Sequence, residues 1–272
     1  MNYLKYSLLL GCLCSVLACQ PPGKEQVGTT SSLAPNPNPA AEGFDLSGSD
    51  QEAILIADRV METMGGRKSW DDTRYLCWDF FGFRHLIWDK HDQRVRIETA
   101  DSIIYLVNLK DMTGNVLKGG VAFTHPDSLA SYLEKGKNIW INDSYWLVMP
   151  FKLKDSGVTL KYLGEDLTKE GEQAEKLQLT FEGVGTTPEN KYLVFVDKEK
   201  HLVTQWAFYR QASQDTANFI LPWGNYKSYG NILLSDERGD RDLSQIMVMD
   251  SLPDYVFESF DPIDLNKLAA LN

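Results

Sequence analysis

The sequence has few basic residues, and it has no long hydrophobic run beyond its first twenty residues. Its 272 residues contain 27 Lys and Arg against 38 Asp and Glu, which gives a formal net charge of -11. A chain this acidic offers no basic surface for nucleic acid. It is not expected to adhere to anionic head groups by charge. No later stretch reaches 18 apolar residues, so none is expected to cross a bilayer as a helix.

Motifs for metal binding and catalysis are also missing. The four histidines lack the spacing of a metal site such as HExxH; they are His85, His91, His125 and His201. No GxSxG, P-loop or GxGxxG stands between a strand and a helix. Acidic residues fall mostly in turns and on the solvent-exposed faces of the predicted strands, so the sequence identifies no carboxylate pair for acid–base catalysis. We therefore expect no enzyme, no cofactor and no metal, with a hydrolase site assembled from distant residues as an open alternative.

Cysteine is scarce. Cys12 and Cys14 lie within the first 18 residues, Cys19 follows them, and Cys77 stands alone. An exported protein that used disulfides would normally carry an even set of cysteines. Cys77 lies in the apolar run 75–78, with no motif around it, so we expect a buried structural thiol and not a catalytic nucleophile.

Residues 1–18 have the layout of a signal peptide. Lys5 supplies the positive charge, and the apolar stretch 8–18 is too short to span a bilayer. The stretch ends in Leu17-Ala18-Cys19, which resembles the bacterial lipobox, in which the Cys thiol is acylated. The resemblance implies a lipid on Cys19. Gln20 after it resembles lipoproteins released to the outer membrane. The alternative is an ordinary signal peptide with Cys19 near the cleavage site by chance.

Residues 19–49 differ in composition from the rest of the chain. They are rich in Pro, Gly, Ser, Thr and Asn and contain few large apolar residues. Such a segment cannot bury enough surface to offset the entropy lost on ordering. We expect a lipidated Cys19 followed by a disordered tether of about 30 Å reach. Residues 50–272 are then expected to form one folded domain.

The folded domain is predicted to begin with a helix. Ser49 and Glu52 have the spacing of a capping box, apolar residues 53–64 follow at helical spacing, and Gly65-Gly66 end the helix. Short β-branched and aromatic runs separated by turn residues come next, which indicates an antiparallel meander. The expected strands are 73–81, 83–89, 94–100, 102–109 and 116–123.

A helical insertion is expected in the middle of the domain. Pro126 suits the first position of a helix, and 135–137 are expected to end it. A second short helix is predicted within 138–151. Strands then resume at 158–163, 176–182, 192–197, 202–209, 232–235 and 244–250. The fold class predicted is α+β, mainly antiparallel β, an incomplete half-open barrel of about eleven strands.

This order of elements resembles the LolA/LolB-like fold. The chain is also similar to an uncharacterised group of Gram-negative lipoproteins in three local patterns, WINDSYWLVMPF at 140–151, VGTTPENKY at 184–192 and LPWGNY at 221–226. The resemblance implies a half-open barrel with an apolar hollow capped by helices. In the carriers LolA and LolB that hollow takes up the acyl chains of lipoproteins in transit to the outer membrane.

Aromatic and Met side chains in these patterns are the candidate site. They could line an adaptable pocket for acyl chains. Alternatively they are core that fastens the helices to the sheet, with Asp143 capping the following turn. The segment 186–190 is predicted to be a loop, and a place at the mouth of the cavity is its alternative role. The candidates for cavity or lid are Trp140, Tyr145, Trp146, Met149, Phe151, Trp223 and Tyr226.

Two functions remain in competition. The first is a carrier or binding module, tethered to the outer membrane by its lipid, that holds a lipid or a lipoprotein acyl group in an apolar hollow. The second is a surface or periplasmic module that binds a protein or glycan and has a filled core. They differ in whether the interior hollow is empty or occupied by side chains.

Overall fold

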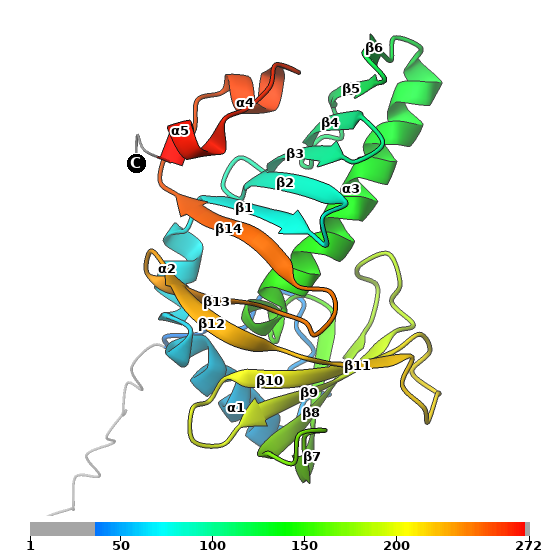
Figure 1. Cartoon of the computed structure of the whole chain (residues 1–272). Coiled ribbons are helices and arrows are strands. Elements are labelled where there is room, and N and C mark those ends of the chain that lie inside the picture. Colours follow the sequence, from blue (N-terminus) through cyan, green and yellow to red (C-terminus); the bar gives the residue numbers. More distant parts are fainter. Residues whose placement is uncertain (1–35, 270–272) are drawn as a thin grey trace, which may run out of the picture. The chain divides into compact units, whose positions relative to one another are not determined.

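The structure is a computed structural model that describes residues 36–269 (Figure 1). The signal peptide and Cys19 expected from the sequence lie outside these residues. Residues 36–269 belong to one compact unit. Two hydrophobic clusters lie within it, and the larger draws on both large sheets and on the first and third helices. This unit therefore contains its own core. Within the described residues, no helix has the length and apolar character needed to cross a membrane.

The ordered domain begins earlier than the sequence predicts. Asn38 is buried, and its side-chain amide donates to Asp58 at 2.8 Å. The backbone N–H groups of Asp45 and Asp50 donate to the carbonyls of Val158 and Leu160. Residues 36–49, expected as part of the tether, are therefore packed against the domain because they hydrogen-bond to the strand that starts at Val158.

Helix α1 (Gln51–Thr63) lies where it was predicted, but its capping box was wrong. Its N-cap is Asp50, which makes no side-chain capping bond. The Ser49 hydroxyl instead accepts the N–H of Leu160 at 3.0 Å, so it ties the helix start to a strand. Gly65 has φ +112°, a conformation suited to glycine, and α2 (Gly66–Asp72) follows it directly.

A seven-stranded antiparallel sheet has the order β14-β1-β2-β3-β4-β5-β6. The strand expected at 116–123 is two strands, because Gly119 and Gly120 adopt positive φ and turn the chain. The strands are β1 (Tyr75–Phe80), β2 (Arg84–Asp89), β3 (Arg94–Thr99), β4 (Ile103–Asn108), β5 (Gly114–Lys118), β6 (Val121–Ala122) and β14 (Leu243–Met249).

A second antiparallel sheet has the order β11-β10-β9-β8-β7, and β12 pairs with β13. The strands of the five-stranded sheet are β7 (Val158–Leu167), β8 (Gln173–Phe181), β9 (Lys191–Asp197), β10 (Val203–Tyr209) and β11 (Phe219–Pro222). The separate two-stranded sheet consists of β12 (Gly224–Tyr229) and β13 (Ile232–Glu237). Residues 36–269 thus form fourteen strands, and not about eleven, because β11, β12 and β6 were not foreseen as separate strands. The sheets do not close into a barrel, and the predicted half-open, mainly antiparallel fold is confirmed.

The expected break between two central helices was wrong: α3 (Pro126–Val148) is one helix of 23 residues. Pro126 is at its start, as predicted. Gly136 does not end it. A Cβ there would lie 3.0 Å from Val107 Cγ2 and 3.1 Å from Tyr105 Cδ1, so glycine lets the helix approach β4 closely. A short 3-10 helix, η1 (Met149–Lys152), continues from its end.

Two short C-terminal helices cover the other face of the seven-stranded sheet (Figure 1). These are α4 (Tyr255–Glu258) and α5 (Leu265–Ala269). Val256, Phe257 and Leu268 pack there with Cys77 and Ile87 in the smaller hydrophobic cluster.

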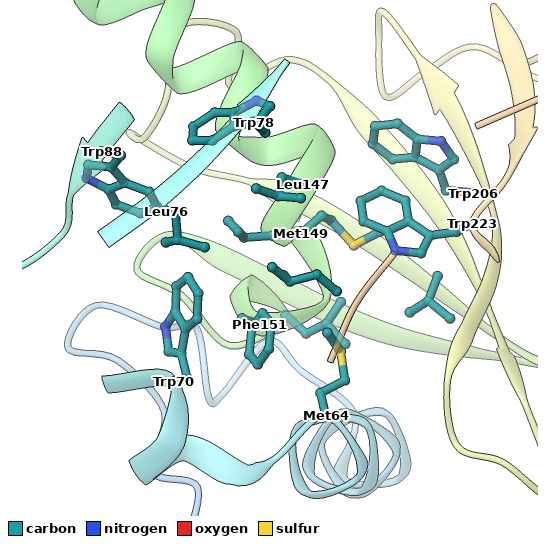
Figure 2. Packing of buried hydrophobic residues seen from close by; sticks show 14 of the residues in the cluster. Met64, Trp70, Leu76, Trp78, Trp88, Leu147, Met149, Phe151, Trp206 and Trp223 are labelled. Atoms are coloured by element: carbon teal, nitrogen blue, oxygen red, sulfur yellow. The ribbon is translucent and has the colours of Figure 1, made fainter. Parts of the chain in front are cut away.

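The main core fills the space between the sheets, α1 and α3. Trp78, Trp206 and Trp223 are completely buried there, together with Met149 and Leu147 at the end of α3 (Figure 2). The apolar hollow expected from the sequence is therefore occupied by these side chains.

Candidate ligand-binding site

The seven candidate residues fall into two groups. Met149 and Trp223 are completely buried and Phe151 nearly so, and Phe151 stacks on Trp70 with ring centres 4.4 Å apart. These three belong to the packed core, as the alternative interpretation expected. Trp140 and Tyr226 are half-buried and also fasten elements together. Trp140 packs edge-on against Trp88, and the Tyr226 hydroxyl donates to the Val203 carbonyl at 2.9 Å.

Tyr145 and Trp146 lie in a cluster of contacting rings at the C-terminal end of α3. Trp146 is the centre of this cluster. Its ring centre lies 5.1 Å from that of Phe81, 4.8 Å from that of Trp206 and 5.4 Å from that of Phe219. The ring of Tyr145 lies 5.3 Å from that of Tyr192. The last turns of α3 are therefore joined to both large sheets through aromatic contacts.

The five-stranded sheet continues this cluster outward. Tyr192 stacks on Trp206 at 5.4 Å, and Phe208 stacks on Phe219 at 5.1 Å. Phe208 and Tyr192 are themselves 5.2 Å apart. Trp206 is completely buried, whereas Tyr192, Phe208 and Phe219 remain half-buried. We call the half-buried set the aromatic patch; it consists of Phe81, Trp146, Tyr192, Phe208 and Phe219.

The turn between β1 and β2 brings Phe81 to the patch. Phe81 has φ +55°, which is unfavourable for a residue with a bulky side chain, and its ring lies 3.9 Å from that of Phe80. Phe83 in the same turn is 64% exposed. A strained aromatic and an exposed aromatic thus stand in one turn at the edge of the patch.

Two polar atoms buried beside the patch have no hydrogen-bond partner among residues 36–269. They are the Tyr145 hydroxyl and the Trp206 Nε1. Burial raises the pKa of Tyr145 far above its ordinary value and that of Tyr192 to about 12, so both phenols are neutral at physiological pH. The five side chains of the patch therefore offer apolar surface and carry no charge at pH 7.

An open groove of about 570 Å³ runs along α3, and we call it the α3 groove. Its size falls in the range of small-molecule sites. A second hollow, near Phe151 and Met61, measures about 10 Å³, the space of one water molecule. The α3 groove is lined by Arg84, Ser131, Glu134, Lys135, Asn138, Ile139, Asn142 and Asp143.

Asp143 does not cap a turn, contrary to the expectation. It is completely buried and accepts two hydrogen bonds from Arg84, at 2.6 and 2.9 Å. Burial raises the pKa of Asp143, and the bonds from Arg84 oppose that rise. This ion pair joins the start of β2 to α3 about one helical turn before Trp146.

Possible metal ligands do not cluster. His85 pairs with Asp79 through Nδ1, and in the part of the chain that the structure describes no three His, Cys, Asp or Glu side chains are placed to hold a metal ion. The segment 186–190 is a loop, as predicted, and Asn190 donates to Thr187 within it.

Sequence patterns found only part of the site. Tyr145 and Trp146 were found because they lie in a dense aromatic run. Phe81, Tyr192, Phe208 and Phe219 were missed because each belongs to a different strand or turn. The available signal was the Phe80-Phe81-Gly82-Phe83 run, in which a glycine turn is surrounded by aromatic residues.

No family model and no curated protein matches the chain. Several solved structures are similar to it, including the following three. A DUF1329 family protein from Desulfovibrio piger is 14% identical, with a TM-score of 0.42 over 76% of this chain and 97% of that one. An outer membrane lipoprotein-sorting protein domain from Vibrio parahaemolyticus is 9% identical, with a TM-score of 0.37 over 76% and 96%. A LolA superfamily protein from Nitrosomonas europaea is 10% identical, with a TM-score of 0.36 over 75% and 97%. The fold of this chain is the open, mainly antiparallel α+β arrangement expected from its sequence.

Proposed function

We propose that this chain is a non-enzymatic binding protein for an amphiphile, whose apolar chain lies on the aromatic patch. The observation that carries the proposal is the unbroken series of ring contacts from Phe81 through Trp146 to Phe219 and Phe208, on side chains that stay partly exposed. The site differs from the enclosed hollow expected at first, because Trp78, Trp206 and Trp223 fill that space.

The patch suits an unbranched apolar chain for physical reasons. Each Å² of apolar surface removed from water contributes about 25 cal/mol. Contiguous, partly exposed apolar surface on a chain with a filled core favours a contact that is completed by another molecule. Within this class we assign a lipid or a lipoprotein acyl group, the ligand that the LolA-like resemblance of the sequence implies.

A direct test uses residues 36–272 and the fluorescent fatty acid cis-parinaric acid. We expect saturable one-to-one binding, with energy transfer from tryptophan to the bound probe. In Phe219→Ala the ligand loses contact with one partly exposed aromatic ring, which should cost about 1 kcal/mol of binding free energy. Binding should therefore weaken about fivefold.

The matched control is Leu167→Ala, which removes an apolar side chain 50% exposed on β7 of the same sheet. Its affinity should equal that of the unaltered chain. Absence of saturable uptake would refute the proposal, and so would an equal loss of affinity in both variants.

The membrane anchor is part of the same proposal. Cys19 would carry the acyl group that holds the protein at the outer membrane. Labelling with radioactive palmitate in cells should mark the full-length chain and the Cys77→Ser control, and should be lost with Cys19→Ser. Label retained in Cys19→Ser would contradict the anchor and leave the binding proposal intact.

A second function is favoured by the filled core: a module whose surface binds a protein or glycan. If the chain has this second function, it is expected not to bind a fatty acid. The parinaric acid titration therefore separates the two functions.

A further inference from the structure

The α3 groove leads along one stripe of α3 toward the aromatic patch. Ser131, Lys135, Asn138 and Asn142 follow at intervals of four, three and four residues, so their side chains share one face of the helix. Lys135 and Trp146 are separated by a helical rise of about 16 Å.

The groove meets the patch at Arg84. The Arg84 guanidinium lies 4.7 Å over the ring of Phe80, and that ring contacts Phe81. Arg84 also lines the groove and pairs with Asp143. Polar groove and apolar patch are therefore contiguous, with the Arg84–Asp143 pair at their junction.

Most charges in the groove are already paired. Asp143 is neutralised by Arg84, and Glu134 lies 3.7 Å from Lys137. Lys135, in contrast, makes no direct ion pair with a carboxylate of residues 36–269: its Nζ lies 5.9 Å over the Tyr132 ring and interacts with Asp101 only through the longer-range field. The side-chain amide of Asn138 is exposed. The groove thus presents one exposed ammonium group without a direct carboxylate contact beside an exposed amide donor, on a chain whose net charge is -11.

We propose that the α3 groove binds the anionic head group of the amphiphile, a carboxylate or a phosphate. This inference rests on the proposed function, because it places the head group of the same ligand whose chain lies on the patch. An ammonium group and an amide donor on adjacent helical turns suit an oxyanion, since hydrogen bonds to a charged acceptor are the stronger ones. Ile139, on the same side of α3, offers apolar contact to the first carbons of the chain.

The test compares cis-parinaric acid with its uncharged methyl ester on residues 36–272. The acid should bind more tightly, and its advantage should shrink as salt rises, because Lys135 is exposed. Lys135→Gln should weaken binding of the acid about two- to fivefold, as expected for an exposed ion pair, and leave the ester unchanged. Lys110→Gln, which removes an exposed lysine between β4 and β5, is the control with the same change in charge and should affect neither probe.

The outcomes separate this inference from the proposed function. Equal affinity for acid and ester overturns the head-group site and leaves chain binding in place. Failure to bind either probe overturns both. Inorganic phosphate should compete only weakly with the acid; phosphate that binds more tightly than the acid would assign the groove to a free anion and overturn the amphiphile head group.

Discussion

The guanidinium carbon of Arg238 lies 3.4 Å from the centre of the Trp223 ring, and both side chains are completely buried. Arg238 donates to the Trp146 carbonyl at 2.7 Å and to the Ser235 hydroxyl at 2.9 Å. The Trp146 carbonyl is one of the last in α3, where no intrahelical partner is available and where the helix dipole favours a cation. Arg238 therefore fixes the helix end that carries Trp146 of the aromatic patch.

Replacement of Arg238 should destabilise the fold. In Arg238→Met the carbonyl and hydroxyl groups stay buried without their donor, so we expect the free energy of unfolding to fall by about 3 kcal/mol. Urea denaturation of residues 36–272 measures this. The free energy of unfolding of Arg238→Lys should lie between those of the unaltered chain and Arg238→Met, because lysine keeps the charge but loses the planar guanidinium. The exposed Arg210→Met is the control, and an unchanged urea midpoint for Arg238→Met would contradict the role of the guanidinium.

Gly136 should tolerate no large side chain, although it lies in the middle of a helix. Its Cβ position is 3.0 Å from Val107 and 3.1 Å from Tyr105, so Gly136→Leu forces α3 away from β4. We expect a loss of about 2–3 kcal/mol, typical of overpacking. Ser128→Leu, at an exposed position of the same helix, should change stability by less than about 0.5 kcal/mol. Equal stability of the two variants would show that the close approach at Gly136 is not needed.

The same glycine shows what sequence patterns could and could not predict. Strands such as β3, with alternating apolar residues, and helix α1, with its apolar stripe, were found to within a few residues because their patterns are local. Gly136 was taken as the end of a helix because the close approach of Val107 is a long-range contact that no local pattern contains. The strand β11 was missed because its pairing with β10 lies across a loop of nine residues and ends at Pro222.

The candidate site was predictable to a smaller extent. Trp146 was named because the run 140–151 is dense in aromatic residues, but Phe151, from the same run, turned out to be core. Whether a ring points to the patch or to the core depends on which strand lies opposite, and that is fixed only by the pairing of β9, β10 and β11.

Asp89 should make stability depend on pH. It is completely buried and accepts hydrogen bonds from Arg74 at 3.2 Å and from Arg94 at 2.8 Å. Burial alone would raise the pKa of Asp89, but the bonds from the two arginines outweigh it and the pKa is lowered from 3.8. The folded state therefore binds fewer protons than the unfolded state, so this stabilisation is complete above pH 3.8 and is lost as pH falls through the folded-state pKa.

The variant Asp89→Asn tests this. At pH 7 it should lower the free energy of unfolding by about 2–3 kcal/mol, because two partly buried arginines lose their counter-ion. The difference from the unaltered chain should shrink as the pH falls below about 4, since the native carboxylate is then protonated too. Urea midpoints from pH 2 to 7 measure it, with the exposed Asp215→Asn as control. A difference that stays constant over this range would rule out the carboxylate as its source.

The C-terminal helices should be released by the loss of one arginine. Arg96, almost fully buried in β3, donates to the carbonyls of Val256 and Ser259, at 3.2 and 2.6 Å, and so holds α4 against the sheet. Cys77 lies in the cluster beneath and is completely buried, and burial raises the pKa of its thiol. Cys77 is the sole cysteine of residues 36–272, so its reaction with a thiol reagent reports on opening of this layer.

We expect Arg96→Met to raise the rate of thiol modification at least about tenfold, because a thiol reacts only when it is accessible and ionised. The urea midpoint, measured on the same sample, separates release of the C-terminal layer from global unfolding. If only this layer opens, the midpoint should fall by less than it would if the faster thiol modification came from global unfolding. Arg241→Met, at an exposed site before β14, should change neither quantity. If Arg96→Met leaves the rate unchanged, the bonds from Arg96 are not needed to hold the C-terminal helices, and the apolar contacts and the Arg94–Asp254 ion pair suffice.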